Sequence, residues 1–190
     1  MNRGASLAAD LFDLCSGEMT WMSLEDEIGQ WDRKSKDFIS DVYDRRHDEP
    51  GFLTDLAGML DDTHLQSGAT WLLKHHFDVG GTPFDADLVT AIYRKTPALV
   101  NWDAKLHVLQ CIARMPIPEP ELRTVETFVR RCLPDDVKFV RAWAYSGLYE
   151  LARRFPEFRA EATKVLNEAL TSETAGSVLS RVKHELKRGY

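Results

Sequence analysis

Cysteines and long apolar runs are scarce in this sequence, and their scarcity excludes several classes of protein. Cys15, Cys111 and Cys132 are an odd number of cysteines, lie far apart and form no CxxC pair. Neither a disulfide framework nor a zinc ribbon is therefore indicated. The apolar stretch at Leu7 to Ala9 is cut by Asp10, and no run approaches the ~20 residues of a membrane-spanning helix. We expect a cytoplasmic protein that has no membrane partner.

Motifs typical of catalysis are also missing. The sequence has no glycine-rich phosphate loop, no GxSxG elbow and no HExxH helix. His107 and Cys111 have the spacing of two metal ligands on one helix face, but a buried cysteine beside a hydrogen-bonded histidine is the simpler interpretation. A chain of 190 residues can bury a core without a metal. We expect no catalytic residue, no metal and no cofactor.

Charge is unevenly distributed along the chain. The net charge is −6, yet residues 1–62 contain 15 acidic and 6 basic side chains, against 15 and 18 in residues 63–190. An acidic protein is a poor candidate for non-specific DNA binding, which depends on neutralising phosphates, although a basic face could bind an anion locally. The acidic N-terminal part is interpreted either as a solvated face or as a docking surface for a basic partner.

Apolar residues recur at helical spacing through most of the chain. From Phe52 onward they lie three and four residues apart in segments of 10 to 18 residues, and no window has a sustained period of two. This pattern predicts an all-α fold without strands. The predicted helices span residues 7–14, 23–31, 34–46, 52–60, 64–77, 85–95, 101–115, 120–133, 136–155, 157–170 and 173–187.

Capping residues support several of these helix ends. Ser23 and Asp26 have the spacing of a capping box, in which the hydroxyl binds a free amide and the acid reaches back. Thr82 is a predicted cap for the following helix, with Asp85 as an acid in its first turn. Asp62 is interpreted as a helix cap rather than as a metal ligand.

Four predicted helices share an apolar pattern, which indicates a repeat. The offsets between them are 40, 35 and 31 residues, close to the unit length of solenoids built from helix pairs. The matched sets are Ala69, Leu72 and Leu73; Leu109, Ile112 and Ala113; Ala144, Gly147 and Leu148; and Ala175, Val178 and Leu179.

The segment at residues 134–144, PDDVKFVRAWA, resembles the signature of HEAT-like (armadillo-type) helical repeats. In that family an Asp in the turn between two helices lies six residues before an Arg on the second helix, and a small residue follows. Asp135, Arg141 and Ala144 occupy these places. The resemblance covers residues 48–188 and implies a right-handed α-solenoid of about five hairpins, with residues 1–47 as an irregular acidic helical cap in the same single domain. It also implies a structural ladder between Asp135 and Arg141.

Asn101, Trp102 and Asp103 resemble the Trp-Asp motif of HEAT-like alkylpurine DNA glycosylases. In that family the catalytic carboxylate lies four residues after the Trp, and here that position is Leu106. The resemblance therefore implies, as an alternative function, a nucleic-acid-binding protein without the usual catalytic group.

The polar positions of the second helices are the candidate binding surface. In a stack of helical hairpins these helices line the concave face. Cations and aromatic rings there would suit an acidic peptide or a helix of a partner protein. We therefore expect a non-enzymatic protein-binding or scaffold module. The predicted partner-binding residues are Lys74, Lys105, Arg114, Lys138, Arg141, Tyr145, Arg153 and Trp102, with Gln66, Thr70 and Gln110 on the same surface.

Overall fold

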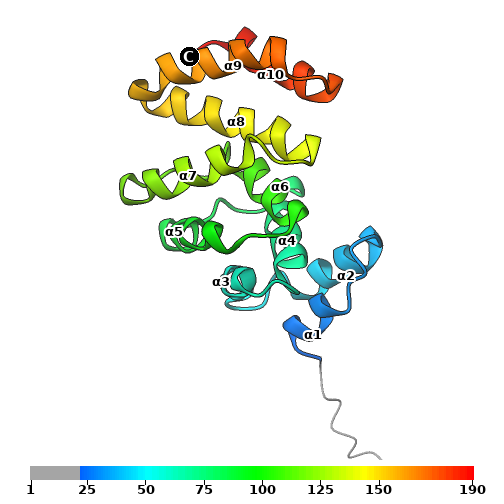
Figure 1. Cartoon of the computed structure of the whole chain (residues 1–190). Coiled ribbons are helices and arrows are strands. Elements are labelled where there is room, and N and C mark those ends of the chain that lie inside the picture. The colour runs from blue at the N-terminus through cyan, green and yellow to red at the C-terminus, as the bar shows by residue number, and fades with distance from the viewer. Residues whose placement is uncertain (1–21) are drawn as a thin grey trace, which may run out of the picture.

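Every regular element in residues 22–190, the part of the chain that the computed structural model describes, is a helix (Figure 1). The predicted all-α fold is confirmed. The predicted helix at residues 7–14 lies outside the described residues, as does Cys15. The α-helices are α1 (Leu24–Gly29), α2 (Lys36–Arg46), α3 (Phe52–Gly58), α4 (Gln66–Asp78), α5 (Ala86–Lys95), α6 (Trp102–Cys111), α7 (Leu122–Cys132), α8 (Lys138–Arg154), α9 (Arg159–Ser172) and α10 (Gly176–Arg188). Short 3₁₀ turns are η1 (Met59–Asp61), η2 (Thr96–Ala98), η3 (Glu119–Glu121) and η4 (Pro156–Phe158).

The helices from α3 onward lie in two layers (Figure 1). Helices α4, α6, α8 and α10 pack against one another in chain order, and we call them the second layer. Helices α3, α5 and α7 form the other layer, where α3 packs on α4 and α7 on α8. Helix α9 lies against both α8 and α10. Helices α4, α6, α8 and α10 therefore form one continuous layer.

The core between the layers explains why these segments are helical. Its largest buried side chains include Leu72 on α4, Tyr93 on α5, Leu109 on α6, Phe128 on α7 and Leu148 on α8. Each belongs to an apolar stripe of helical period, and removing these stripes from water is the main favourable contribution to folding.

Local hydrogen bonds set several helix ends. The Ser23 hydroxyl accepts from the amide of Asp26 at 3.1 Å, as predicted, and donates to the carboxylate of Asp26 at 2.9 Å. Asp85, rather than Thr82, caps α5 by accepting from the amide three residues further on at 2.8 Å. Asp62 binds the amide two residues ahead at 2.7 Å, which stabilises a turn before α4 begins. The cap prediction for Asp62 is thus corrected to a turn contact.

The N-terminal helices α1 and α2 pack against α4 (Figure 1). A Cβ atom at Gly68 on α4 would lie 2.6 Å from Cγ2 of Ile28, so the small residue allows α1 to approach closely. Trp31 and Trp71 contact each other beside this point, with ring centroids 6.1 Å apart. Helices α1 and α2 therefore cover part of α4. Lys74, further along α4, is partly exposed.

Candidate functional site

Ion pairs link successive helices of the second layer near their N-terminal ends. Lys105 on α6 binds the carboxylate of Asp135, which precedes α8, and Arg141 on α8 binds Glu173, which precedes α10, at 2.9 Å. The predicted contact between Asp135 and Arg141 exists in a different form. Arg141 donates to the main-chain carbonyl of Asp135 at 2.8 Å, while the carboxylate of Asp135 binds Lys105. The charges of Lys105 and Arg141 are therefore engaged in linking helices.

The pairs Lys105–Asp135 and Arg141–Glu173 form a ladder of ion pairs. Asp103 extends this ladder to the N-terminal region. Its carboxylate accepts from Arg33 at 2.8, 2.9 and 3.1 Å and from the hydroxyl of Ser67 on α4 at 2.8 Å. Burial opposes ionisation of this group, but the hydrogen bonds from Arg33 and Ser67 hold the pKa of Asp103 below its ordinary value. Arg33 reaches it from a left-handed backbone conformation, with φ at 64°. Asp103 therefore fixes the N-terminal helices to the second layer.

A cleft of about 250 Å³ lies between α4, the C-terminal end of α6 and α8. Lys74 binds Asp78 on α4, and Nη1 of Arg114 lies 3.6 Å from the same carboxylate. The wall on α8 is the indole of Trp143. Two predicted binding residues, Lys74 and Arg114, thus meet in one cleft, between aromatic walls. The full lining is Lys74, Phe77, Asp78, Gln110, Cys111, Arg114 and Trp143.

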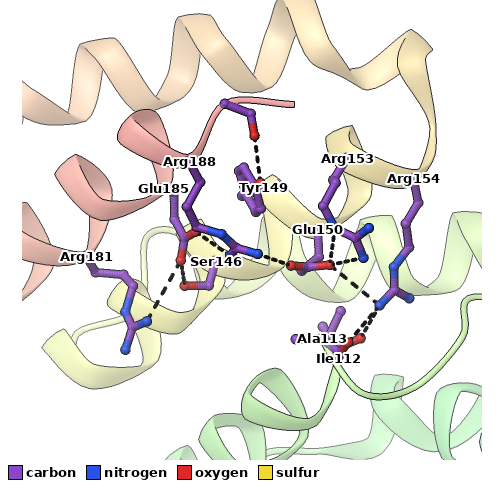
Figure 2. A network of polar contacts seen from close by, with 11 residues as sticks. Ile112, Ala113, Ser146, Tyr149, Glu150, Arg153, Arg154, Arg181, Glu185 and Arg188 are labelled. Carbon is purple, nitrogen blue, oxygen red and sulfur yellow. Dashed lines mark hydrogen bonds and ion pairs between the residues drawn. The ribbon is translucent and has the colours of Figure 1, made fainter.

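Next to this cleft, charged side chains of α8 and α10 form a continuous array (Figure 2). Arg153 donates two hydrogen bonds to Glu150, at 2.8 and 2.9 Å. Arg188 bridges both carboxylates, with distances of 3.4 Å to Glu150 and 2.9 Å to Glu185. Nη1 of Arg181 lies 3.9 Å from Glu185. We call these five residues the arginine array.

Aromatic rings connect the array to the cleft and stiffen it. The guanidinium of Arg181 lies 4.0 Å from the ring centroid of Trp143, the residue that also lines the cleft. The guanidinium of Arg188 lies 4.3 Å from the ring of Tyr149. Cation–π contacts of this kind favour a fixed guanidinium plane. Together the cleft and the array make a strip across the second layer, which we call the cationic strip: Lys74, Asp78, Arg114, Trp143, Arg181, Glu185, Arg188, Glu150 and Arg153.

The remaining predicted residues lie away from the strip or inside the protein. Tyr145 is buried in a small apolar cluster between α8, α9 and α10, and its hydroxyl donates to Glu173 at 3.4 Å. Gln66 and Thr70 are likewise buried, so the prediction that these three side chains line an exposed surface is wrong. Lys138 is exposed beside Phe139, and Trp102 is 46% exposed at the start of α6.

The part of the cationic strip that lies on α10 was not predicted from the sequence. Arg181, Glu185 and Arg188 have the spacing of one helix face, which is a signal that could have been read from the sequence. Glu185 binds Ser146 and Arg188 binds Glu150, both on α8 and 39 and 38 residues away in the chain, so no local pattern predicts these contacts.

The groups considered for metal binding and catalysis lie in non-reactive environments. His107 is buried and its Nδ1 lies 3.1 Å from the hydroxyl of Thr70, while burial lowers the pKa of His107 to about 4. Burial also raises the pKa of Cys111 to about 12, so its reactive thiolate form is disfavoured. Leu106, at the position of the glycosylase carboxylate, packs against the core. Within residues 22–190 no three His, Cys, Asp or Glu side chains are grouped as metal ligands.

Comparisons with known proteins found no match. No protein-family model, no curated protein and no solved structure matches the chain. Among the described helices, none combines the length and apolar character needed to cross a membrane.

Proposed function

We propose that this chain is a non-enzymatic cytoplasmic scaffold, a HEAT-like helical-repeat solenoid whose second layer binds an acidic segment of a partner protein. The cationic strip is the observation that supports this proposal. It contains five basic and three acidic side chains, so positive charge is in excess on one face of a protein whose net charge is −6. A local excess of charge opposite to that of the whole protein favours oriented association with a complementary surface.

The exposure of the basic side chains also favours the cationic strip as the binding surface. The side chains of Arg114, Arg153 and Arg188 are 50%, 43% and 42% exposed, whereas those of Lys105 and Arg141 are 18% and 19% exposed and engaged in ion pairs. Partner binding is therefore assigned in this proposal to the strip rather than to the ladder. Trp143, between the cleft and the array, supplies an aromatic contact of the kind enriched in interface hot spots.

A double charge reversal within the cleft tests the proposal. The full chain and its Lys74→Glu/Arg114→Glu variant are used to capture partners from lysate of the native organism, with and without nuclease. We expect a stoichiometric protein partner that resists nuclease, and at least a tenfold loss of it with the variant, because opposite charge is replaced by like charge.

The matched control reverses two exposed cations that lie outside the cationic strip. Arg123 on α7 and Lys164 on α9 have side chains 83% and 73% exposed, and Arg123→Glu/Lys164→Glu changes the net charge equally. Equal loss with both variants would make the effect one of net charge and contradict the proposed surface. Recovery of nuclease-sensitive DNA or RNA would instead favour the alternative of a nucleic-acid-binding protein.

A further inference from the structure

We infer that the arginine array is a subsite for a phosphorylated side chain within the acidic segment of the partner. This inference rests on the proposed function and names the chemistry that the C-terminal end of the strip recognises. It is carried by the layering of charge, the fixed orientation of the guanidinium groups and the imbalance of charge within the array.

The carboxylates of the array are buried, and its arginine side chains are partly exposed to solvent. The side chains of Glu150 and Glu185 are 4% and 1% exposed, whereas those of Arg153, Arg188 and Arg181 are 43%, 42% and 31% exposed. An anion arriving from solvent therefore meets N–H donors first. The buried carboxylates act from behind, where they hold the donors in place as a supporting layer.

Several donors of the array are free to bind a ligand. Among the described residues, Nη1 of Arg153, Nε of Arg188 and the whole guanidinium of Arg181 donate no hydrogen bond to the protein. Arg188 and Arg181 also rest on the rings of Tyr149 and Trp143. Because these planes are already oriented, little side-chain entropy is lost when an anion binds.

The charge of the network suits a dianion. The three arginines of the array exceed its two carboxylates by one positive charge, and Arg154, which lies 3.6 Å from Glu150 behind the array, raises the excess to two. Arg154 directs its donors to main-chain carbonyls after α6, including that of Ile112 at 2.9 Å. A phosphoserine or phosphothreonine carries a charge of about −1.5 to −2 at pH 7 and three acceptor oxygens, which matches the excess better than one carboxylate does.

The neighbouring cleft adds a second feature of the segment. Trp143 contributes to the cleft wall and to the array, so a chain bound along the strip would place an apolar side chain in the cleft next to the phosphate. A peptide suits this site better than a nucleic acid does, because the net charge of −6 opposes a polyanion with a charge on every nucleotide more strongly than a segment with few charges.

The test uses three fluorescein-labelled peptide libraries that differ only at their central residue: phosphoserine, Glu or Ser, with the same randomised flanking positions. Binding to the full chain is measured by fluorescence anisotropy. We expect the phosphoserine library to bind at least tenfold more tightly than the Glu library, and the Ser library to bind least, because the excess of positive charge requires a dianion.

Substitutions at Arg153 and Arg181 show whether the array is responsible for binding phosphoserine. Arg188 is left unchanged because it pairs with both buried carboxylates. Arg153→Ala/Arg181→Ala should reduce the affinity for the phosphoserine library about tenfold and that for the Glu library less than threefold. Arg153→Lys/Arg181→Lys keeps the charge but removes the planar donor groups, so it should lower the preference for phosphoserine over Glu while leaving Glu binding intact. Circular-dichroism melting verifies that both variants are folded, and Arg123→Ala on α7 is the neutral control.

The outcomes separate this inference from the proposed function. Equal binding of the phosphoserine and Glu libraries, lost on Lys74→Glu/Arg114→Glu, would overturn the phosphate subsite and leave the acidic-segment scaffold standing. No binding of either acidic library would contradict both. Competition by free inorganic phosphate as effective as that by the phosphoserine library would overturn the peptide source, and tighter binding of a single-stranded 20-nucleotide RNA would do the same.

Discussion

Arg141 on α8 and Glu173, just before α10, form a two-point ion pair with distances of 2.9 and 3.2 Å although 32 residues separate them. The same guanidinium donates to the main-chain carbonyls of Asp135 and Asp136 at 2.8 and 3.1 Å. One side chain therefore joins the turn before α8 to the turn before α10. Such paired, partly buried charges stabilise only when their donors and acceptors are satisfied, as they are here.

A double-mutant cycle on this pair should measure a favourable coupling. We expect the combination of Arg141→Ala and Glu173→Ala to give a coupling free energy of about 1 to 2 kcal/mol in urea unfolding, since both side chains are largely removed from water. The exposed pair Lys164 and Glu168, 3.8 Å apart, is the comparison and should couple by less than about 0.5 kcal/mol. Equal coupling in the two cycles would show that the ladder contributes no more than surface charge.

Removing the charge of Asp103 should loosen the N-terminal helices. Asp103→Asn leaves Arg33 without its carboxylate and weakens the hydrogen bond from Ser67. The free energy of unfolding should therefore fall by about 2 to 3 kcal/mol. Limited proteolysis should cut first between α2 and α3. Asp136→Asn, at an exposed position, is the control and should change neither measurement. If the two variants behave alike, Asp103 does not fix the N-terminal helices.

Two glycine substitutions should have opposite effects on stability. Gly68→Ala places a Cβ 2.6 Å from Ile28, so α1 has to move and the cost should be about 1 to 3 kcal/mol. Gly58→Ala meets no atom within 4 Å and removes a flexible residue from the end of α3, so it should be neutral or stabilise by up to about 1 kcal/mol. Urea midpoints compare the two. A stable Gly68→Ala variant would mean that α1 does not pack closely on α4 in solution.

Helix positions could be predicted because they depend on local properties of the chain. The apolar stripe of α8 and the Ser23 cap are both readable within about four residues, and both are found in the structure. The outward face was harder to predict. Tyr145 shares a helix with Arg141 and Arg153, but α9 and α10 pack over it, and no pattern within α8 reports that contact.

The candidate site depends even more on distant contacts. Lys74 and Arg114 were predicted from the sequence and meet in the cleft, since Lys74 lies on α4 and Arg114 lies in the turn after α6, which packs on α4. The link from Arg33 to Asp103 spans 70 residues, and its left-handed backbone is not signalled by a glycine. Arg–Glu contacts between α8 and α10 likewise become visible only when the two helices are placed side by side.

Burial of His107 should make the protein less stable in mild acid. Its Nδ1–H donates to the hydroxyl of Thr70, which itself donates to the carbonyl of Gln66 at 2.6 Å, so the neutral ring is held in the interior. Burial lowers the pKa of His107 to about 4, against about 6.5 in an unfolded chain.

The unfolded state therefore takes up a proton as the pH falls through 6.5, whereas the native state does so only near pH 4. Across this interval the free energy of unfolding should fall by about 3 kcal/mol on account of His107 alone. Urea unfolding at pH 7, 6, 5 and 4.5 measures how the free energy of unfolding changes with pH.

His107→Gln, whose amide can still donate to Thr70, should remove most of this decrease. The comparison isolates His107, because carboxylates that titrate in the same interval are common to both proteins. His64→Gln, at an exposed position, should leave the slope as it is. Parallel curves for the wild type and His107→Gln would mean that this ring is not the group through which acid destabilises the fold.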